Sequence, residues 1–174
     1  MNKWVLGARV KTLPAAVAPV LVGTSFAPKI NWLNAGLALI VSLFLQIAVN
    51  FSNDYSDGVR GTDANRVGPT RLVASGLASA KAVRTAAFTS FATACIAGTL
   101  LSLNTTLWLI LVGLISVLAA WGYTGGKNPY GYLGFGEISV FIFFGLVATI
   151  GSYYVQTQEI NLSLIHISEP TRPY

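Results

Sequence analysis

The chain has 174 residues, of which 53% are hydrophobic and only 10% are charged. Its mean hydropathy of +0.62 excludes an ordinary soluble domain, in which about a quarter of the residues are charged. The net charge of +5 would suggest nucleic acid for a soluble protein, but in a membrane protein the placement of Lys and Arg matters more than their sum. We therefore expect a lipid bilayer as partner and no nucleic acid. The lone Cys95 excludes an internal disulfide.

Several apolar runs approach the roughly 20 residues that a helix needs to cross about 30 Å of hydrocarbon. The first dozen residues carry basic side chains around Trp4 and are typical of an interfacial segment, and Pro14 marks the start of the first span. The sequence predicts an all-α membrane protein with five transmembrane helices, at about residues 15–30, 35–54, 81–103, 107–123 and 138–154.

Basic residues are distributed unevenly over the segments between these spans. Because cytoplasmic segments are enriched in Lys and Arg, this asymmetry predicts a multi-pass protein with a cytoplasmic N-terminus and two cytoplasmic polar loops. Only Lys29 falls on the opposite side of the first 158 residues. The basic residues on the cytoplasmic side are Lys3, Arg9, Lys11, Arg60, Arg66, Arg71, Lys81, Arg84 and Lys127.

A polar stripe runs along the end of the second span. Its members recur at helical spacing and share about a third of the helix circumference. Unpaired amides would be costly in lipid, so a hydrophilic cavity wall explains the stripe better than solvated interface residues do. Carboxylates one helical turn apart are suitable ligands for a magnesium ion bound to substrate phosphates. The stripe comprises Gln46, Asn50, Asn53, Asp54 and Asp57.

Polar segments follow the second and fourth spans. The first, from Tyr55 to Ser79, is rich in Gly, Asp and Arg and is expected to be a functional loop. Within it, Arg66 and Arg71 can give bidentate hydrogen bonds to diphosphate oxygens, with ordinary positive-inside topology as the alternative. In the second segment, Lys127 is a candidate diphosphate contact and Tyr123 a candidate cation-stabilising ring. An anchoring lysine and an interfacial aromatic are equally good interpretations of this pair.

These motifs resemble the UbiA superfamily of intramembrane aromatic prenyltransferases, and most closely the 1,4-dihydroxy-2-naphthoate polyprenyltransferases of menaquinone biosynthesis. NDYSDGVRGTD with RVGPTRLVASG is similar to the first Asp-rich motif and its basic continuation, and YTGGKNPYGYLGFGE to the second cytoplasmic loop. The similarity extends over about residues 3–158. The resemblance implies a bundle of nine transmembrane helices in a bacterial inner membrane, of which the five predicted spans are the N-terminal part.

The resemblance also implies the reaction. A polyprenyl group passes from polyprenyl diphosphate to 1,4-dihydroxy-2-naphthoate with Mg²⁺ as cofactor, giving demethylmenaquinone. Asp54 and Asp57 are then the catalytic residues, holding the metal at the leaving diphosphate. The residues implied for the metal are Asn50, Asn53, Asp54 and Asp57, and those implied for the diphosphate are Arg66, Arg71, Lys127 and Tyr123.

One departure from the family pattern concerns the C-terminal part of the chain. Superfamily members carry a second Asp-rich motif on a later helix, whereas the only acids after Gln158 are Glu159 and Glu169. We therefore expect an N-terminal fragment that is inactive as it stands. Residues 159–174 have the character of translated adapter read-through and are expected to be non-native, so His166 receives no catalytic role.

Other functions are compatible with the same residues. A relative acting on 4-hydroxybenzoate or another aryl acceptor would share every motif. A membrane transporter or channel could line a pore with the stripe, but it would need inverted-repeat symmetry and polar residues near the midplane. A phosphatidyl-alcohol transferase motif is broken at Gly61, and a structural assembly subunit would be indifferent to the loss of Asp54. The motifs leave prenyl length and oligomeric state undetermined.

Overall fold

The computed structural model describes residues 2–61, 70–125 and 129–160, and all regular secondary structure within these ranges is helical, without a strand. One segment, η3, is a π-helix between two α-helical pieces. In chain order the elements are α1 (Lys3–Ala8), η1 (Val10–Thr12), α2 (Pro14–Ser25), α3 (Trp32–Arg60), α4 (Ala80–Asn104), α5 (Leu109–Gly122), η2 (Tyr130–Leu133), α6 (Gly136–Val140), η3 (Phe141–Val147) and α7 (Ala148–Thr157).

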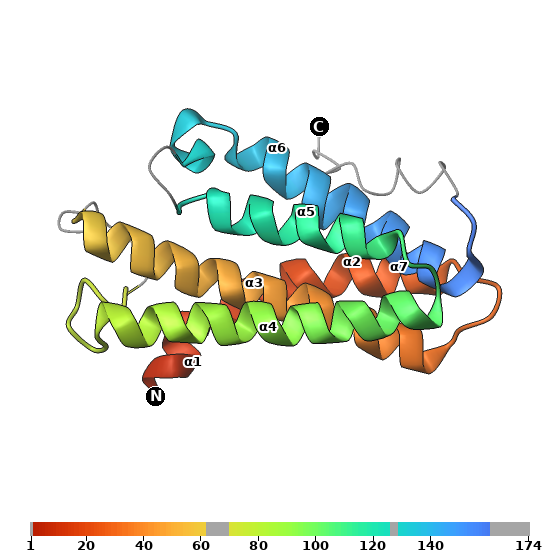
Figure 1. Cartoon of the computed structure of the whole chain (residues 1–174), viewed down its shortest axis with the longest axis horizontal. Helices are drawn as coiled ribbons and strands as arrows, with labels where there is room; N and C mark the ends of the chain where they lie inside the picture. The colour runs from red at the N-terminus through yellow and green to blue at the C-terminus, as the bar shows by residue number, and fades with distance from the viewer. Residues whose placement is uncertain (1, 62–69, 126–128, 161–174) are drawn as a thin grey trace, which may run out of the picture.

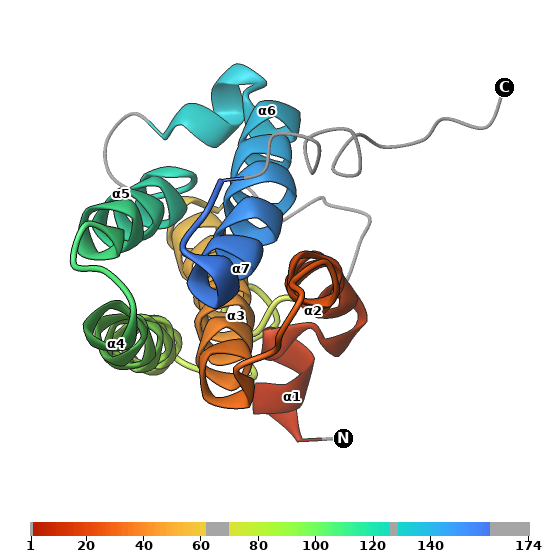
Figure 2. The same cartoon turned by 90° about the vertical axis from the view of Figure 1, so that its right-hand side faces the viewer.

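Helix α3 forms the centre of the bundle. It contacts α1, α2, α4, α5 and α7, and the end-on view in Figure 2 shows these helices arranged around it. The connection 70–79 and the segment that follows α5 both lie at one end of the molecule, on the left in Figure 1. The turns from α2 to α3 and from α4 to α5 lie at the opposite end. This topology brings the two polar segments predicted from the sequence to the same end of the bundle.

Three helical stretches are long and apolar enough to cross a membrane, namely Trp32–Arg60, Ala80–Asn104 and Gly136–Thr157. The N-terminal pair Lys3–Thr12 and Pro14–Ser25 is bent by 49° and would count as a fourth span if the two pieces act together. The chain is therefore a multi-pass membrane protein with three to four candidate spans in its described residues. Helix α5 lies where the fourth span is predicted but has only 14 residues.

Two predicted boundaries are wrong. The second helix does not end near residue 54: α3 continues to Arg60, so the predicted loop does not start at Tyr55. Gly61 ends α3 in the left-handed conformation with φ 72°, and its N–H donates to the carbonyl of Asp57. Helix α2 ends at Ser25 rather than near residue 30, because Pro28 disfavours helical geometry in the residue before it.

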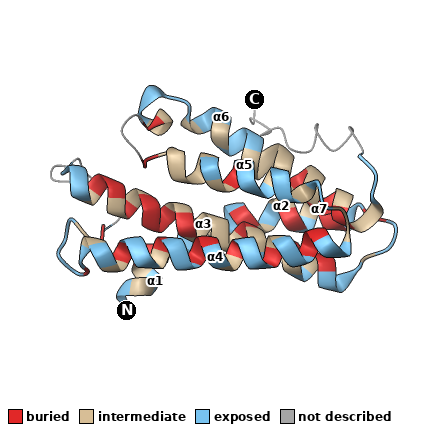
Figure 3. Ribbon diagram, viewed as in Figure 1, coloured by how far each residue is buried: buried red, intermediate tan, exposed pale blue. Residues whose placement is uncertain are grey.

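Close packing between helices depends on small residues, as is usual in membranes. Ala48 on α3 and Ala87 on α4 are completely buried. A Cβ on Gly23 of α2 would lie 2.1 Å from the Thr149 carbonyl oxygen of α7, so only glycine permits this crossing. Large apolar side chains such as Leu118, which is 62% exposed, instead point outward, and Figure 3 shows exposed positions along the outer helix faces. This distribution suits a protein surrounded by lipid.

Candidate functional site

A cavity of about 560 Å³ lies between α3, α4, α5 and the segment from α6 to α7. Most of its wall is apolar, with η3 contributing Phe143 and Phe144. Toward the end of the bundle that carries the polar segments, the wall becomes polar. The polar residues at that end include Gln46, Asn50, Asn53, Tyr123 and Tyr130. The sequence-based interpretation of the stripe as a cavity wall therefore holds for its three amides.

The first two amides are held by the N-terminal segment. Nδ2 of Asn50 donates to the carbonyl of Ala8 at 2.9 Å and to Oγ1 of Thr12 at 3.0 Å. Nε2 of Gln46 donates to the same hydroxyl at 3.2 Å. Asn50 is only 3% exposed, so these bonds satisfy amide hydrogens that would otherwise be costly to bury. The short helix η1, which places Thr12 here, belongs to the segment expected at the membrane interface.

The segment after α5 closes over the polar end of the cavity. Oγ1 of Thr124 donates to Oδ1 of Asn53 at 2.7 Å. The Tyr123 ring packs edge-on against Tyr130, with centroids 5.5 Å apart and an interplanar angle of 77°. A Cβ on Gly131 would lie 2.5 Å from the Tyr123 carbonyl oxygen, so a glycine is needed where the chain folds back over Tyr123. Both tyrosines therefore line this end of the cavity.

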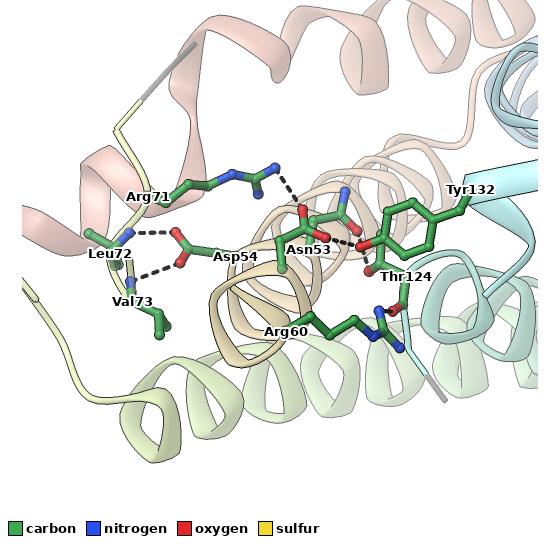
Figure 4. Close-up of polar contacts among 9 residues, drawn as sticks. Asn53, Asp54, Arg60, Arg71, Leu72, Val73, Thr124 and Tyr132 are labelled. Atoms are coloured by element: carbon green, nitrogen blue, oxygen red, sulfur yellow. Dashed lines mark hydrogen bonds and ion pairs between the residues drawn. The ribbon is translucent and has the colours of Figure 1, made fainter. Parts of the chain in front are cut away.

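Asp54 points away from the cavity and binds the connection between α3 and α4. It is completely buried, and its two carboxylate oxygens accept from the backbone N–H groups of Leu72 at 2.8 Å and Val73 at 3.0 Å (Figure 4). Val73 packs directly against Gly58, where a Cβ would lie 2.5 Å from the Val73 Cβ. The connection after Arg71 is therefore attached to α3 by a charged acceptor and a close backbone contact.

Asp57 joins both polar segments to α3. Its Oδ2 lies 2.9 Å from Nη2 of Arg71, and both side chains are 7% exposed. Its Oδ1 accepts a hydrogen bond from the hydroxyl of Tyr132 in η2. The guanidinium of Arg60 lies over the Tyr132 ring, 5.5 Å from its centroid, and donates to the Thr124 carbonyl. Figure 4 shows these side chains converging on the last turns of α3.

The predicted site residues are thus divided between two layers. Asn50, Asn53 and Tyr123 line the cavity, whereas Asp54, Asp57 and Arg71 form a buried polar layer beyond it. Arg66 and Lys127 lie outside the described residues. Among the residues that are described, no three His, Cys, Asp or Glu side chains gather as a metal-binding group.

Sequence reasoning missed Thr12, Thr124 and Tyr132. Thr124 and Tyr132 belong to the motif YTGGKNPYGYLGFGE, so the motif itself indicated their neighbourhood but not their partners in α3. Thr12 had no distinguishing pattern, since it is separated from Gln46 by 34 positions and from Asn50 by 38. Such contacts depend on how the N-terminal segment crosses α3.

Comparison with known proteins places the chain in a family. A model of the UbiA prenyltransferase family matches residues 16–168. The match includes part of the tail that was expected to be non-native, and that expectation stays a prediction.

Several curated relatives share one name. Proteins named 1,4-dihydroxy-2-naphthoate octaprenyltransferase are 53% identical in Mycobacterium tuberculosis, over 91% of this chain and 56% of the relative, and 50% identical in Mycobacterium leprae, over 91% and 55%. The protein of that name from Escherichia coli is 37% identical over 93% of this chain and 56% of its own length. The chain spans about half the length of these curated relatives. With the family model covering most of its residues, the chain belongs to the UbiA prenyltransferase family.

Proposed function

We propose that the protein containing these residues transfers a polyprenyl group from polyprenyl diphosphate to 1,4-dihydroxy-2-naphthoate, giving the reduced (quinol) form of demethylmenaquinone. The observation that carries the proposal is the two-part cavity. Its long apolar wall suits a hydrocarbon chain, and its polar end, with Gln46, Asn50 and Asn53, suits the head of the substrate. The names of the three relatives support the choice of donor and acceptor.

We propose Mg²⁺ as the cofactor, with Asn50, Asn53, Asp54 and Asp57 as the residues that would hold it. The donor set fits this ion, because it offers only carboxylate and amide oxygens. In the structure each Asp54 oxygen accepts one backbone hydrogen bond from the connection 70–79 and the carboxylate points away from the cavity, so Asp54 would have to turn from this connection to share an ion with Asn50 and Asn53. Mg²⁺ typically uses one or two protein carboxylates and takes its other ligands from water and substrate phosphate. When bound, the ion would neutralise charge on the diphosphate leaving group.

The arginines supply the remaining positive charge in this proposal. Arg71 is fixed beside Asp57, from where its forked guanidinium can give parallel hydrogen bonds to diphosphate oxygens. Arg66 and Lys127 are proposed as further diphosphate contacts. Charge that is already in place stabilises the departing diphosphate more strongly than mobile charge does, because no reorganisation is needed during the reaction.

Aromatic residues are proposed to stabilise the cation that remains when the diphosphate leaves. Loss of diphosphate leaves an allylic cation, which the face of Tyr123 at the cavity wall can stabilise. The apolar wall with Phe143 and Phe144 keeps out water that would quench the cation. The electron-rich naphthoate ring then attacks the prenyl carbon, and the ring carbon that forms the new bond loses its carboxylate as CO₂, with the bonding electron pair returning to the ring.

We also propose that the chain crosses a bacterial inner membrane five times as part of a nine-helix bundle, with its N-terminus and both polar segments in the cytoplasm. The described parts of both segments lie at one end of the bundle, which supports a shared side of the membrane, and the excess of Lys and Arg in these segments favours the cytoplasmic side. The 174 residues alone are expected to be inactive, since only two acids of the described residues, Asp54 and Asp57, reach the candidate site.

The experiment is an assay of the full-length protein in proteoliposomes with polyprenyl diphosphate and 1,4-dihydroxy-2-naphthoate. We expect demethylmenaquinone with Mg²⁺ and none with excess chelator. Asp54→Ala and Asp57→Ala should each abolish transfer, and unchanged turnover in either would contradict the metal assignment. If the protein prenylates 4-hydroxybenzoate in preference, then 4-hydroxybenzoate rather than the naphthoate is the acceptor. If the substrate crosses the membrane but no prenyl group is transferred, the protein is a transporter rather than a prenyltransferase.

A further inference from the structure

We infer that Thr12 is a positioning residue that turns the amides of Gln46 and Asn50 so that their carbonyl oxygens, rather than their NH₂ groups, face the cavity. This inference rests on the proposed function and assigns a chemical preference to one part of its site. The contact that carries it is a hydroxyl shared by two amides from successive turns of α3.

The hydrogen bonds of Thr12 leave one arrangement for its proton. A threonine hydroxyl can donate one hydrogen bond and accept two. Oγ1 of Thr12 lies 2.9 Å from the carbonyl of Arg9, which can only accept, so the proton of Thr12 is used there. The hydroxyl can then only accept from its other neighbours. The atoms of Gln46 and Asn50 that face it must therefore be nitrogens, at 3.2 and 3.0 Å.

Asn50 has a second restraint that gives the same result. Its Nδ2 also donates to the carbonyl of Ala8 at 2.9 Å, and two acceptors together use both hydrogens of the amide. Gln46 has no such second partner among the described residues, so its orientation depends on Thr12. An exchange of the amide O and N atoms, which is often undecided by shape alone, is excluded here by the acceptors that surround the nitrogens.

The carbonyl oxygens are consequently directed toward the cavity that both residues line. Neither oxygen accepts a hydrogen bond from the described part of the chain. Asn50 offers a ligand only its carbonyl oxygen, because both of its amide hydrogens are used, whereas Gln46 offers its carbonyl oxygen and keeps one amide hydrogen. The two carbonyl oxygens are matched to a hard cation or to a hydroxyl donor rather than to a phosphate oxygen. In the proposed reaction the two sources of such a group are Mg²⁺ and a hydroxyl of the aromatic acceptor.

The test uses the full-length protein in proteoliposomes with Thr12→Val, which removes the hydroxyl at nearly constant volume, and Thr12→Ser, which keeps it. Thr89→Val is the matched control, because the Thr89 hydroxyl bonds only within α4 and is exposed. Apparent constants are measured separately for Mg²⁺, for 1,4-dihydroxy-2-naphthoate and for polyprenyl diphosphate. Binding of Mn²⁺, followed by electron paramagnetic resonance without substrates, provides a readout that does not depend on turnover.

We expect Thr12→Val to raise the apparent constant for either Mg²⁺ or 1,4-dihydroxy-2-naphthoate about tenfold, which is the effect of one ordinary hydrogen bond. The apparent constant for polyprenyl diphosphate should change less than about twofold. A change in the Mg²⁺ constant with weaker Mn²⁺ binding identifies the cation as the ligand. A change in the naphthoate constant alone identifies the hydroxyl. Thr12→Ser should restore wild-type values, and Thr89→Val should not depart from them.

Gln46→Met is the second variant, used alongside Thr12→Val in case the latter does not fold. It removes the amide oxygen and should raise the same constant. The inference is overturned if Gln46→Met leaves both constants unchanged, or if Thr12→Ser is as impaired as Thr12→Val. If the wild-type protein transfers no prenyl group, the proposed function is wrong. If the wild-type protein is active and the variants have its apparent constants, only the role assigned to Thr12 is wrong.

Discussion

The carboxylate of Asp57 lies 2.9 Å from the guanidinium of Arg71, and both side chains are 7% exposed. The pair attaches α3 to the connection 70–79. The other carboxylate oxygen of Asp57 accepts a hydrogen bond from the hydroxyl of Tyr132. An arginine expected to bind diphosphate is therefore already paired with an acid expected to bind the metal. Substrate would have to share this pair rather than meet two independent charges.

Neutralising both members of the pair should cost less stability than the two single changes would cost together. Asp57→Asn removes the carboxylate that faces the buried guanidinium of Arg71, and Arg71→Gln does the converse; breaking one partner of a buried pair typically costs up to about 3–5 kcal/mol. The double variant should lose less than the sum of the two. Thermal unfolding in detergent, arranged as a double-mutant cycle, measures the difference. Strict additivity would show that the pair makes no net contribution.

Asp54→Asn should loosen the connection 70–79 without unfolding the bundle. An amide presents only one acceptor oxygen, so one of the N–H groups of Leu72 and Val73 loses its partner, at about 1–3 kcal/mol. Hydrogen exchange of a peptide covering these residues should accelerate on the order of tenfold or more. A peptide from α4 provides the internal control. Unchanged exchange at Leu72 and Val73 would mean that Asp54 does not anchor the connection.

Tyr132→Phe should impair prenyl transfer while the protein stays folded. The variant loses the hydrogen bond to Asp57 but keeps a ring beneath Arg60. We expect kcat/KM of the full-length protein to fall about tenfold, the loss of one hydrogen bond to a charged group. Tyr55→Phe is the control, since the hydroxyl of Tyr55 makes no hydrogen bond within the described residues and its ring faces Arg84. Equal kinetics in the two variants would remove Tyr132 from the site.

Arg71→Lys should weaken binding of the diphosphate despite conserving charge. A lysine ammonium cannot reproduce the planar fork that faces Asp57 and can also serve a diphosphate. The expected result is a KM for polyprenyl diphosphate raised about tenfold, with the KM for the acceptor unaffected. Steady-state kinetics with each substrate varied in turn separate the two effects. An equal rise in both constants would point to general disruption of the site.

Gly58→Ala should destabilise the protein although alanine is the better helix former. A Cβ at this position would lie 2.5 Å from the Val73 Cβ, and overpacking of this kind costs about 1–3 kcal/mol. Gly36→Ala in the same helix is the matched control, because nothing lies within 4 Å of its added Cβ. That variant should gain about 0.5–1 kcal/mol. Thermal unfolding midpoints that rise in both variants would contradict the close contact between α3 and the connection.

The sequence by itself determined the class of protein and the chemistry of the stripe. Composition excluded a soluble domain, and the spacing from Gln46 to Asp57 placed five polar side chains on one helix because helical periodicity is a local property. The motifs around Asp54 and Lys127 were sufficient for the resemblance to the UbiA family, which the family match confirmed.

Only the tertiary structure decided which partner each member of the stripe meets. Helical spacing alone does not separate Asn50, which lines the cavity, from Asp54, whose oxygens accept from the backbone of residues 72 and 73. It also could not show that Thr12 and Tyr132 contact α3, since each is dozens of positions away from its partner. Local spacing fixes the face of a helix on which a residue lies, whereas the orientation of its amide or carboxylate depends on the segments packed against that face.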